Sequence, residues 1–335
     1  MIKSYTIGSL VQFPSLDDLE RIQFTLNSHM RPYRRHASEM ITRVVQEYPN
    51  FPELFVHEDY IRTIPRFPLL KQDYKSEMII ETFQLLSHPK VKGMVIHMDS
   101  PFPQSMIAKS HDDINVFIDL VKSLNSQMYV GYNEILTILT TLPEIKTVND
   151  LIGAYYRLSV DMFYVALDSY AKHRNKNISE LSPLYLENTT KVPLKDATIK
   201  PGSVMHNAIL STAHLDLYGI CYDTEHAYAI GDVVPSPDYI LSLREINPRI
   251  LVHLNTIEKG VQQGNYLDRH SMTAIDACQV HDYKHYLLFA KWLDAHGIPY
   301  LREVKSTVMQ YELAFQKTLK ESYPQVYSEI YDDNN

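Results

Sequence analysis

The stretch GICYDTEHAYAIG, residues 219–231, contains the pattern that decides the fold class. A short apolar and aromatic run, typical of a buried strand, reaches Asp223, and an amphipathic run follows it. The same pattern recurs in SYTIGSLV from Ser4, RIQFTL from Arg21, ELFVHEDY from Glu53, GMVIHMD from Gly93, PLYLENT from Pro183, RILVHLN from Arg249 and IPYLREV from Ile298. Eight such βα units predict an α/β protein with a (β/α)₈ TIM barrel, in which reactive groups lie at the carboxyl ends of the strands.

The chain length favours one large domain that covers residues 1–335. One connection is unusually long, because His97 in the fourth run and Glu187 in the fifth run are 90 positions apart, whereas a βα unit needs roughly 30 to 40. Residues from about 127 to 179 have helical periodicity. We therefore expect a helical insertion between strands 4 and 5.

Composition excludes several classes of protein. With 45% hydrophobic and 21% charged residues the chain is a folded globule, and its formal charge of −8 argues against a partner held by overall basic charge. Two cysteines, Cys221 and Cys278, are too few for a disulfide framework and favour an intracellular, reducing compartment, such as the cytoplasm, the nucleus or nucleoid, or a virion. The start of the chain has no signal-peptide pattern, and no segment approaches the roughly 18 apolar residues of a membrane span.

Metal-binding side chains recur where the predicted strands end. Since all strand ends of a barrel point into one bowl, we expect these side chains to converge although they lie far apart in the sequence. Imidazoles and carboxylates together suit two or three borderline-soft divalent ions, zinc first and manganese or iron next. The candidate ligands are His57, His97, Glu187, Asp223, His226, His253, Asp268, His270 and Glu303.

A structural interpretation is the more common one for any single member of this set. A lone histidine or carboxylate at a strand end is usually a hydrogen-bonded structural residue. That interpretation weakens for the whole set, because burying four carboxylates without compensating cations would cost too much.

The sequence resembles the endonuclease IV family of apurinic/apyrimidinic (AP) endonucleases, which are trinuclear zinc enzymes on a (β/α)₈ barrel. The most specific motifs are YDTEHAYAIG at 222–231, VHLN at 252–255, LDRH at 267–270 and YLENT at 185–189. Weaker matches are FVHEDYI around His57, VIHMD at 95–99 and LREV at 301–304.

The resemblance implies three Zn²⁺ ions per chain, with Mn²⁺ or Fe²⁺ as substitutes. It places His57 and His97 on one ion, with Glu187 bridging to a second. The second ion would also take Asp223, His253 and Glu303, and the third would take His226, Asp268 and His270. Glu187 and Glu303 are the candidate catalytic residues. Such ions supply a nucleophile at neutral pH and neutralise the phosphate of a phosphodiester.

The activity implied by the resemblance is DNA repair. A monomeric enzyme would cut double-stranded DNA on the 5′ side of an abasic site, leave a 3′-hydroxyl, and trim blocked 3′ ends. Tyr60, Ile61 and Arg31 match positions that enter the duplex at the lesion, and Arg269 is a further candidate DNA contact. Basic residues in the predicted loops add candidate phosphate contacts: Arg34, Arg35, Arg62, Arg66, Lys191, Lys195 and Lys200.

Departures beside the ligands indicate a divergent member of the family, and a viral or phage origin is one interpretation of that divergence. TKVP at 190–193 replaces the usual glycine-rich run, Glu225 replaces a cysteine, and Thr256 replaces an aspartate. The glycines expected after LDRH are missing from SMTAIDA.

Two alternatives stay open. A metal-dependent sugar isomerase or epimerase of the xylose-isomerase-like barrels uses one or two ions, so the third ligand set would be superfluous there. The second alternative is a non-catalytic DNA-binding protein on the same barrel. Such a protein is expected to lack some of the metal ligands, whereas this sequence has all of the candidate ligands.

Overall fold

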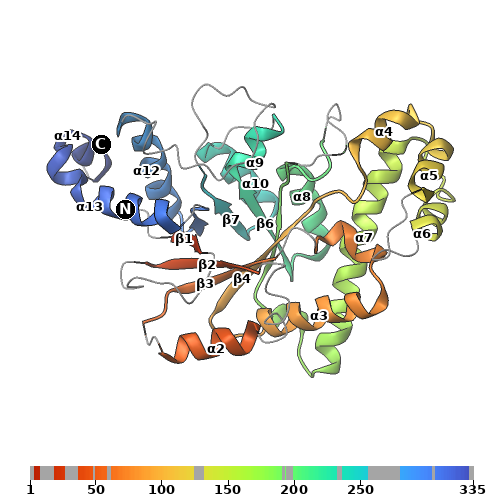
Figure 1. Cartoon of the computed structure of the whole chain (residues 1–335), viewed down its shortest axis with the longest axis horizontal. Coiled ribbons are helices and arrows are strands. Elements are labelled where there is room, and N and C mark those ends of the chain that lie inside the picture. The colour runs from red at the N-terminus through yellow and green to blue at the C-terminus, as the bar shows by residue number, and fades with distance from the viewer. Residues whose placement is uncertain are drawn as a thin grey trace.

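Figure 1 shows a computed structural model of the chain, and it describes residues 4–7, 19–26, 37–47, 50–58, 62–123, 132–190, 193, 199–231, 236–255, 280–303 and 306–331. Its strands are all parallel to their neighbours, and their hydrogen-bonded order follows the chain from β1 to β8. Because β8 also packs beside β1 and β2, the sheet curls into a nearly closed barrel. The strands are β1 (Ser4–Ile7), β2 (Arg21–Thr25), β3 (Glu53–His57), β4 (Val91–His97), β5 (Leu184–Glu187), β6 (Tyr218–Asp223), β7 (Ile250–His253) and β8 (Tyr300–Leu301).

The sequence prediction of an α/β protein with a parallel barrel-like sheet is thereby confirmed. Helices lie outside the sheet in Figure 1 and cover it on several sides. They are α2 (Ala37–Glu47), η3 (Ile64–Leu69), α3 (Gln72–Leu86), α4 (Gln104–Ser110), α5 (Ile114–Lys122), α6 (Tyr132–Leu139), α7 (Val148–His173), η4 (Ile178–Glu180), α8 (Val204–Ser211), η5 (Thr212–His214), α9 (Thr224–Ala229), α10 (Pro237–Ile246), α12 (Val280–Ala295), α13 (Ser306–Ser322) and α14 (Pro324–Tyr331).

The long connection between β4 and β5 contains helices α4 to α7. Helix α7 begins with a capping box, in which the Thr147 side chain accepts from the backbone N–H of Asp150 and the Asp150 side chain accepts from that of Thr147. Its buried face packs on α3 and η3. Helices α6 and α7 lie within residues 127–179, where helical periodicity was expected, and α4 and α5 precede that range.

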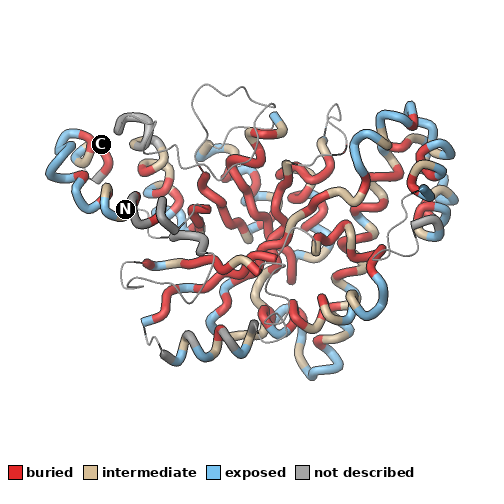
Figure 2. Tube along the Cα trace, in the orientation of Figure 1, coloured by how far each residue is buried: buried red, intermediate tan, exposed pale blue. Residues whose placement is uncertain are grey.

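The strands are buried along most of their length (Figure 2). The interior of the barrel has its own apolar layer, apart from the larger core between the sheet and the helices. Tyr185 is the bulkiest member of this layer, and Gly93 and Gly219 flank its ring. A Cβ at Gly219 would lie 2.7 Å from that ring, so the two glycines make room for the tyrosine. The layer comprises Phe55, Val95, Tyr185, Cys221, Leu251 and Leu301.

Among the described residues, every helix is too short or too polar to cross a membrane.

Candidate metal centre

The candidate ligands at the strand ends stand directly after the interior layer. Side chains alternate across a strand, so the residue two positions after an inward-facing residue faces inward as well. Each member of the apolar layer is followed at that distance by a candidate ligand. In chain order these ligands are His57, His97, Glu187, Asp223, His253 and Glu303.

The register of the sheet places ligands side by side. His97 and Glu187 are lateral partners across β4 and β5, and Asp223 and His253 are lateral partners across β6 and β7. Four elements therefore contribute to one end of the barrel, as the sequence pattern predicts.

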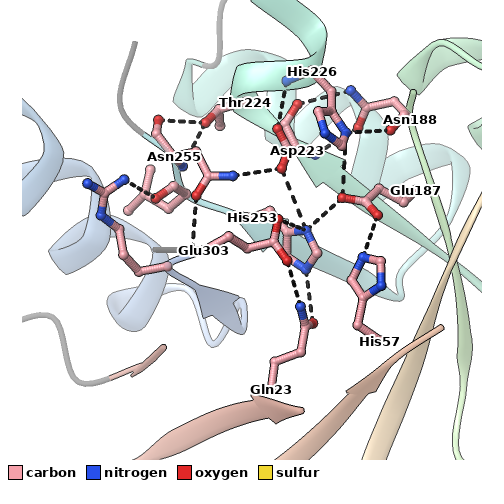
Figure 3. A network of polar contacts seen from close by, with 12 residues as sticks. Gln23, His57, Glu187, Asn188, Asp223, Thr224, His226, His253, Asn255 and Glu303 are labelled. Carbon is pink, nitrogen blue, oxygen red and sulfur yellow. Dashed lines mark hydrogen bonds and ion pairs between the residues drawn. The ribbon is translucent and has the colours of Figure 1, made fainter. Parts of the chain in front are cut away.

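Glu187 lies at the centre of this cluster (Figure 3) and its side chain is fully buried. Its Oε2 is 2.9 Å from His57 Nε2 and 2.8 Å from His97 Nε2. Its Oε1 is 2.7 Å from Nδ1 of His253 and 3.7 Å from Nδ1 of His226. One carboxylate thus faces four imidazoles that come from four different segments.

Backbone carbonyls fix the tautomers of two of these imidazoles. Nδ1–H of His57 donates to the carbonyl oxygen of Glu58 at 2.6 Å, and Nδ1–H of His226 donates to the carbonyl oxygen of Asn188 at 2.9 Å. A carbonyl oxygen can only accept, so Nδ1 carries the proton in both rings and Nε2 is left as a ligand atom. Histidines that bind metals are oriented in this way by the hydrogen bond of their other nitrogen.

Asp223 and Glu303 complete the acidic side of the cluster. Asp223 Oδ2 lies 3.7 Å from Nδ1 of His253, and Glu303 Oε2 lies 3.5 Å from the same nitrogen. Asp223 is also the N-cap of α9, because its Oδ1 accepts from the backbone N–H of His226 at 2.7 Å. This cap fixes the orientation of both Asp223 and His226.

Two asparagines hold the carboxylates and were not predicted as site residues. Asn255 Nδ2 donates to Asp223 Oδ2 at 2.7 Å, and its Oδ1 accepts from the backbone N–H of Glu303 at 3.0 Å. Asn188 forms a pair of hydrogen bonds with the backbone of Asp223, at 2.7 and 3.0 Å. Both asparagines occur in the motifs VHLN and YLENT, directly after or two positions after a ligand, which is the signal that could have identified them.

A third unpredicted residue is Gln23 of β2. Its side-chain amide contacts both His253 and Glu303, as Figure 3 shows. It stands in a strand without any predicted ligand, so nothing in the sequence pattern marked it.

The cluster shifts the pKa values of its members strongly. Burial by itself raises the pKa of Glu187, but His253, His97 and His57 together hold it well below its ordinary value. Burial by itself lowers the pKa of His253, but Cys221, Glu303 and Glu187 raise it well above its ordinary value. Burial also lowers the pKa of His97, and Glu187 reverses the direction. The carboxylates therefore demand positive charge, from protons or from cations.

The residues present fit divalent metal ions. Four groups of side chains could each hold an ion, because within each group the ligand atoms all lie within 4.8 Å of one another. Each group combines imidazole with carboxylate. Those that match the ligand sets expected from the sequence are His57–His97–Glu187 and Glu187–Asp223–His253–Glu303, with Glu187 in both; the others are His57–His253–Glu303 and Glu187–Cys221–His253. The described donors could therefore hold a divalent cation, and Glu187 belongs to both expected ligand sets.

Several predicted site residues lie outside the described residues. Of the third ligand set, His226 is described, and the centroid of its ring lies 5.9 Å from that of His97. The site residues outside the described part of the chain are Asp268 and His270 of the same set and the candidate DNA contacts Arg31, Tyr60, Ile61 and Arg269, together with Arg34, Arg35, Lys191 and Lys195 from the basic loops.

Two basic residues expected to contact phosphate are engaged within the protein instead. The Arg62 guanidinium pairs with Glu81 at 2.6 Å and with Glu77 at 3.3 Å. The Lys200 ammonium donates to the carbonyl oxygens of Ile230 at 2.6 Å and Gly231 at 3.3 Å, where α9 ends. The Arg62 side chain is thus tied to α3 and the Lys200 side chain to the end of α9, whereas the sequence suggested basic side chains without partners in the protein.

No protein-family model matches the chain, and no curated protein matches it at a significant level.

Proposed function

We propose that this protein is a zinc-dependent DNA repair endonuclease that hydrolyses the phosphodiester on the 5′ side of an abasic site and leaves a 3′-hydroxyl. The same centre would trim blocked 3′ ends, since both reactions break a phosphodiester. The substrate partner is double-stranded DNA that contains an abasic or damaged site, and the enzyme would act as a monomer in an intracellular, reducing compartment.

The observation that carries this proposal is the environment of Glu187. Its two oxygens face imidazole nitrogens at 2.7, 2.8 and 2.9 Å, and the tautomer of His57 points a lone pair at the carboxylate. A lone pair and a carboxylate oxygen repel each other at such a distance unless a cation or a proton lies between them. Zinc ions held by Glu187 together with His57, His97 and His253 would satisfy all these atoms.

Zinc bound here would supply Lewis acidity and a nucleophile at neutral pH. The protein's own part is to hold the donors rigidly. Asp223 is fixed by the amide of Asn255 and by the start of α9, and Glu303 is fixed through its backbone by Asn255. Rigid donors would hold bound zinc in a fixed position, which favours the hydrolysis of a phosphodiester.

The DNA part of the proposal depends on residues of the loops. Tyr60, Ile61, Arg31 and Arg269 would contact the duplex at the lesion, and His226, Asp268 and His270 would hold a third ion. An abasic nucleotide is already unstacked, so turning it into the bowl costs less than flipping a paired nucleotide. The complete fold would be one domain, a closed (β/α)₈ TIM barrel with a helical insertion at about 127–179 between strands 4 and 5.

A second candidate function is a metal-dependent sugar isomerase or epimerase. It is favoured by one observation, namely that the described donors suit two ions and need no third. A sugar would then bind in the bowl, and the arginines and aromatic residue of the loops would have no task.

The two functions are separated by offering both substrates to the zinc-loaded protein. We expect incision of a duplex with one abasic-site analogue, on its 5′ side only, no incision of the intact duplex, and no isomerisation of aldoses or ketoses. Incision should stop with a chelator and return with added zinc. Isomerisation of a sugar with an uncut abasic duplex would overturn the proposal in favour of the second candidate.

A further inference from the structure

Gln23 is a polar residue in the apolar interior of the barrel. It lies on β2 opposite Phe55 of the interior layer, and its side chain is fully buried. A buried amide is costly unless its donors and acceptors are satisfied. Gln23 therefore needs polar partners, and the cluster of ligands above the layer supplies them.

The hydrogen bonds of this amide are directional. Nε2 of Gln23 donates to Oε1 of Glu303 at 2.8 Å, so the NH₂ end of the amide faces the carboxylate. Its Oε1 then faces Nε2 of His253 at 3.0 Å, and an amide oxygen can only accept. His253 must therefore carry a proton on Nε2, and in the neutral ring, the form that binds a cation, this leaves Nδ1 with a lone pair.

That lone pair points at the acidic side of the cluster. Nδ1 of His253 lies 2.7 Å from Glu187, 3.5 Å from Glu303 and 3.7 Å from Asp223. All three carboxylates are candidate ligands of the same ion, so the tautomer set by Gln23 is the one in which His253 completes their set.

We propose that Gln23 is a positioning residue of the metal centre, whose one amide fixes both the tautomer of His253 and the position of the Glu303 carboxylate. The inference deepens the proposed function and rests on it, because it assumes that His253 and Glu303 bind an ion. Without the amide, His253 is free to place its proton on Nδ1 and donate to Glu187, which removes a ligand atom. Glu303 loses the side-chain hydrogen bond from Gln23 in the same change.

The test compares zinc binding by the full chain and by two variants. Gln23→Met keeps the length and volume of the side chain and removes both hydrogen bonds. Asn247→Leu is the matched control, because Asn247 is also a fully buried amide and precedes β7, whereas His253 ends that strand. The Asn247 amide forms hydrogen bonds with Ser211 and with the backbones of Tyr218 and Arg249. Zinc affinity is measured by competition with a fluorescent chelator.

We expect Gln23→Met to bind zinc about 10–100-fold more weakly than wild type, which is the usual effect of losing a hydrogen bond to a metal ligand. Asn247→Leu should bind zinc as wild type does, although both variants lower the stability of the fold. If the wild-type chain binds zinc and Gln23→Met binds it with the same affinity, the proposed role of Gln23 is overturned and the zinc centre stands. Absence of zinc binding by the wild-type chain would overturn both.

A measurement on the wild-type chain tests the same inference without any variant. In the zinc-loaded protein, nitrogen NMR of labelled histidine should show His253 protonated on Nε2. A His253 protonated on Nδ1 would contradict the proposal even if Gln23→Met did not fold.

Discussion

Nδ1 of His253 lies 2.7 Å from Oε1 of Glu187, although 66 positions separate the two residues in the chain. Both side chains are completely buried, and burial alone would shift the pKa of each toward its neutral form. The pKa of Glu187 nevertheless lies well below its ordinary value, mainly because of His253, and that of His253 lies well above because Cys221, Glu303 and Glu187 raise it. An imidazole and a carboxylate held together in this way form a pair that either shares a proton or binds a cation.

The first prediction concerns pH. The pKa values of His253 and His97 are raised in the folded chain. The two protonated histidines therefore stabilise the fold fully below about pH 6.5, and this stabilisation is lost as the pH rises through their raised pKa values. The lowered pKa of Glu187 acts oppositely, and its contribution is lost only in acid, below about pH 4.3. Chelator-treated protein should therefore lose stability as pH rises from about 6 to 8.

Zinc should reverse this trend, because imidazoles bind the ion only when they are neutral. The gain in melting temperature on adding zinc should grow as pH rises from about 6 to 8. Thermal unfolding of chelated and zinc-loaded samples across this interval measures it. A gain that shrinks with pH would argue against histidine ligands.

The second prediction concerns Asn255, which joins Asp223 to the backbone of Glu303. Asn255→Ala should lower the free energy of unfolding by about 1–3 kcal/mol, because buried polar groups lose their partner. It should also weaken zinc binding about 10–100-fold. Asn247→Ala is the control: it should lower the free energy of urea unfolding by a similar amount and leave zinc affinity unchanged. Equal zinc affinity in both variants would refute the link between Asn255 and the centre.

The third prediction concerns the buried ion pair beside the centre. Arg302 Nη2 lies 2.8 Å from Oε1 of Glu312, and neither side chain is more than 2% exposed. Glu312→Leu would leave the guanidinium buried without its counterion, so we expect a loss of about 3–5 kcal/mol in the free energy of unfolding. The double variant Arg302→Met with Glu312→Leu should recover much of that loss. Urea unfolding of all three variants checks this, and purely additive losses would contradict it.

The fourth prediction concerns Cys221. Its thiol lies within β6 and is completely buried, and burial raises its pKa far above the ordinary value. Only the thiolate is nucleophilic, so native protein should leave Cys221 unmodified by an alkylating reagent at mildly alkaline pH. Mass spectrometry of the Cys221 peptide, with and without denaturant, gives the result. Rapid alkylation in the native state would show that the layer below the ligands opens easily.

Much of this arrangement is readable from the sequence. Strands ending in His57, His97, Glu187, Asp223 and His253 could be predicted because parallel strands that end in ligands must bring them to one end of a barrel. The positions of Asn188 and Asn255 were within reach for the same reason, since they lie one and two positions after strand ends.

Other features depend on contacts that no local pattern encodes. Gln23 resembles any polar residue in a short strand, and its role depends on partners 230 and 280 positions away. The pairing of Arg62 with Glu77 and Glu81 on α3 is likewise a tertiary contact, so the sequence suggested a free basic residue where the fold contains an ion pair.

The most direct test of the central claim measures zinc content and incision on the same preparation, for wild type and Glu187→Gln. Glu81→Gln is the control, because Glu81 is also a buried carboxylate but pairs with Arg62 and belongs to none of the candidate ligand groups. We predict close to three zinc ions per chain and incision 5′ to an abasic site for wild type and for Glu81→Gln, with both lost in Glu187→Gln. Incision by Glu187→Gln at the wild-type rate, or wild-type protein that cuts the abasic duplex without bound metal, would contradict the account.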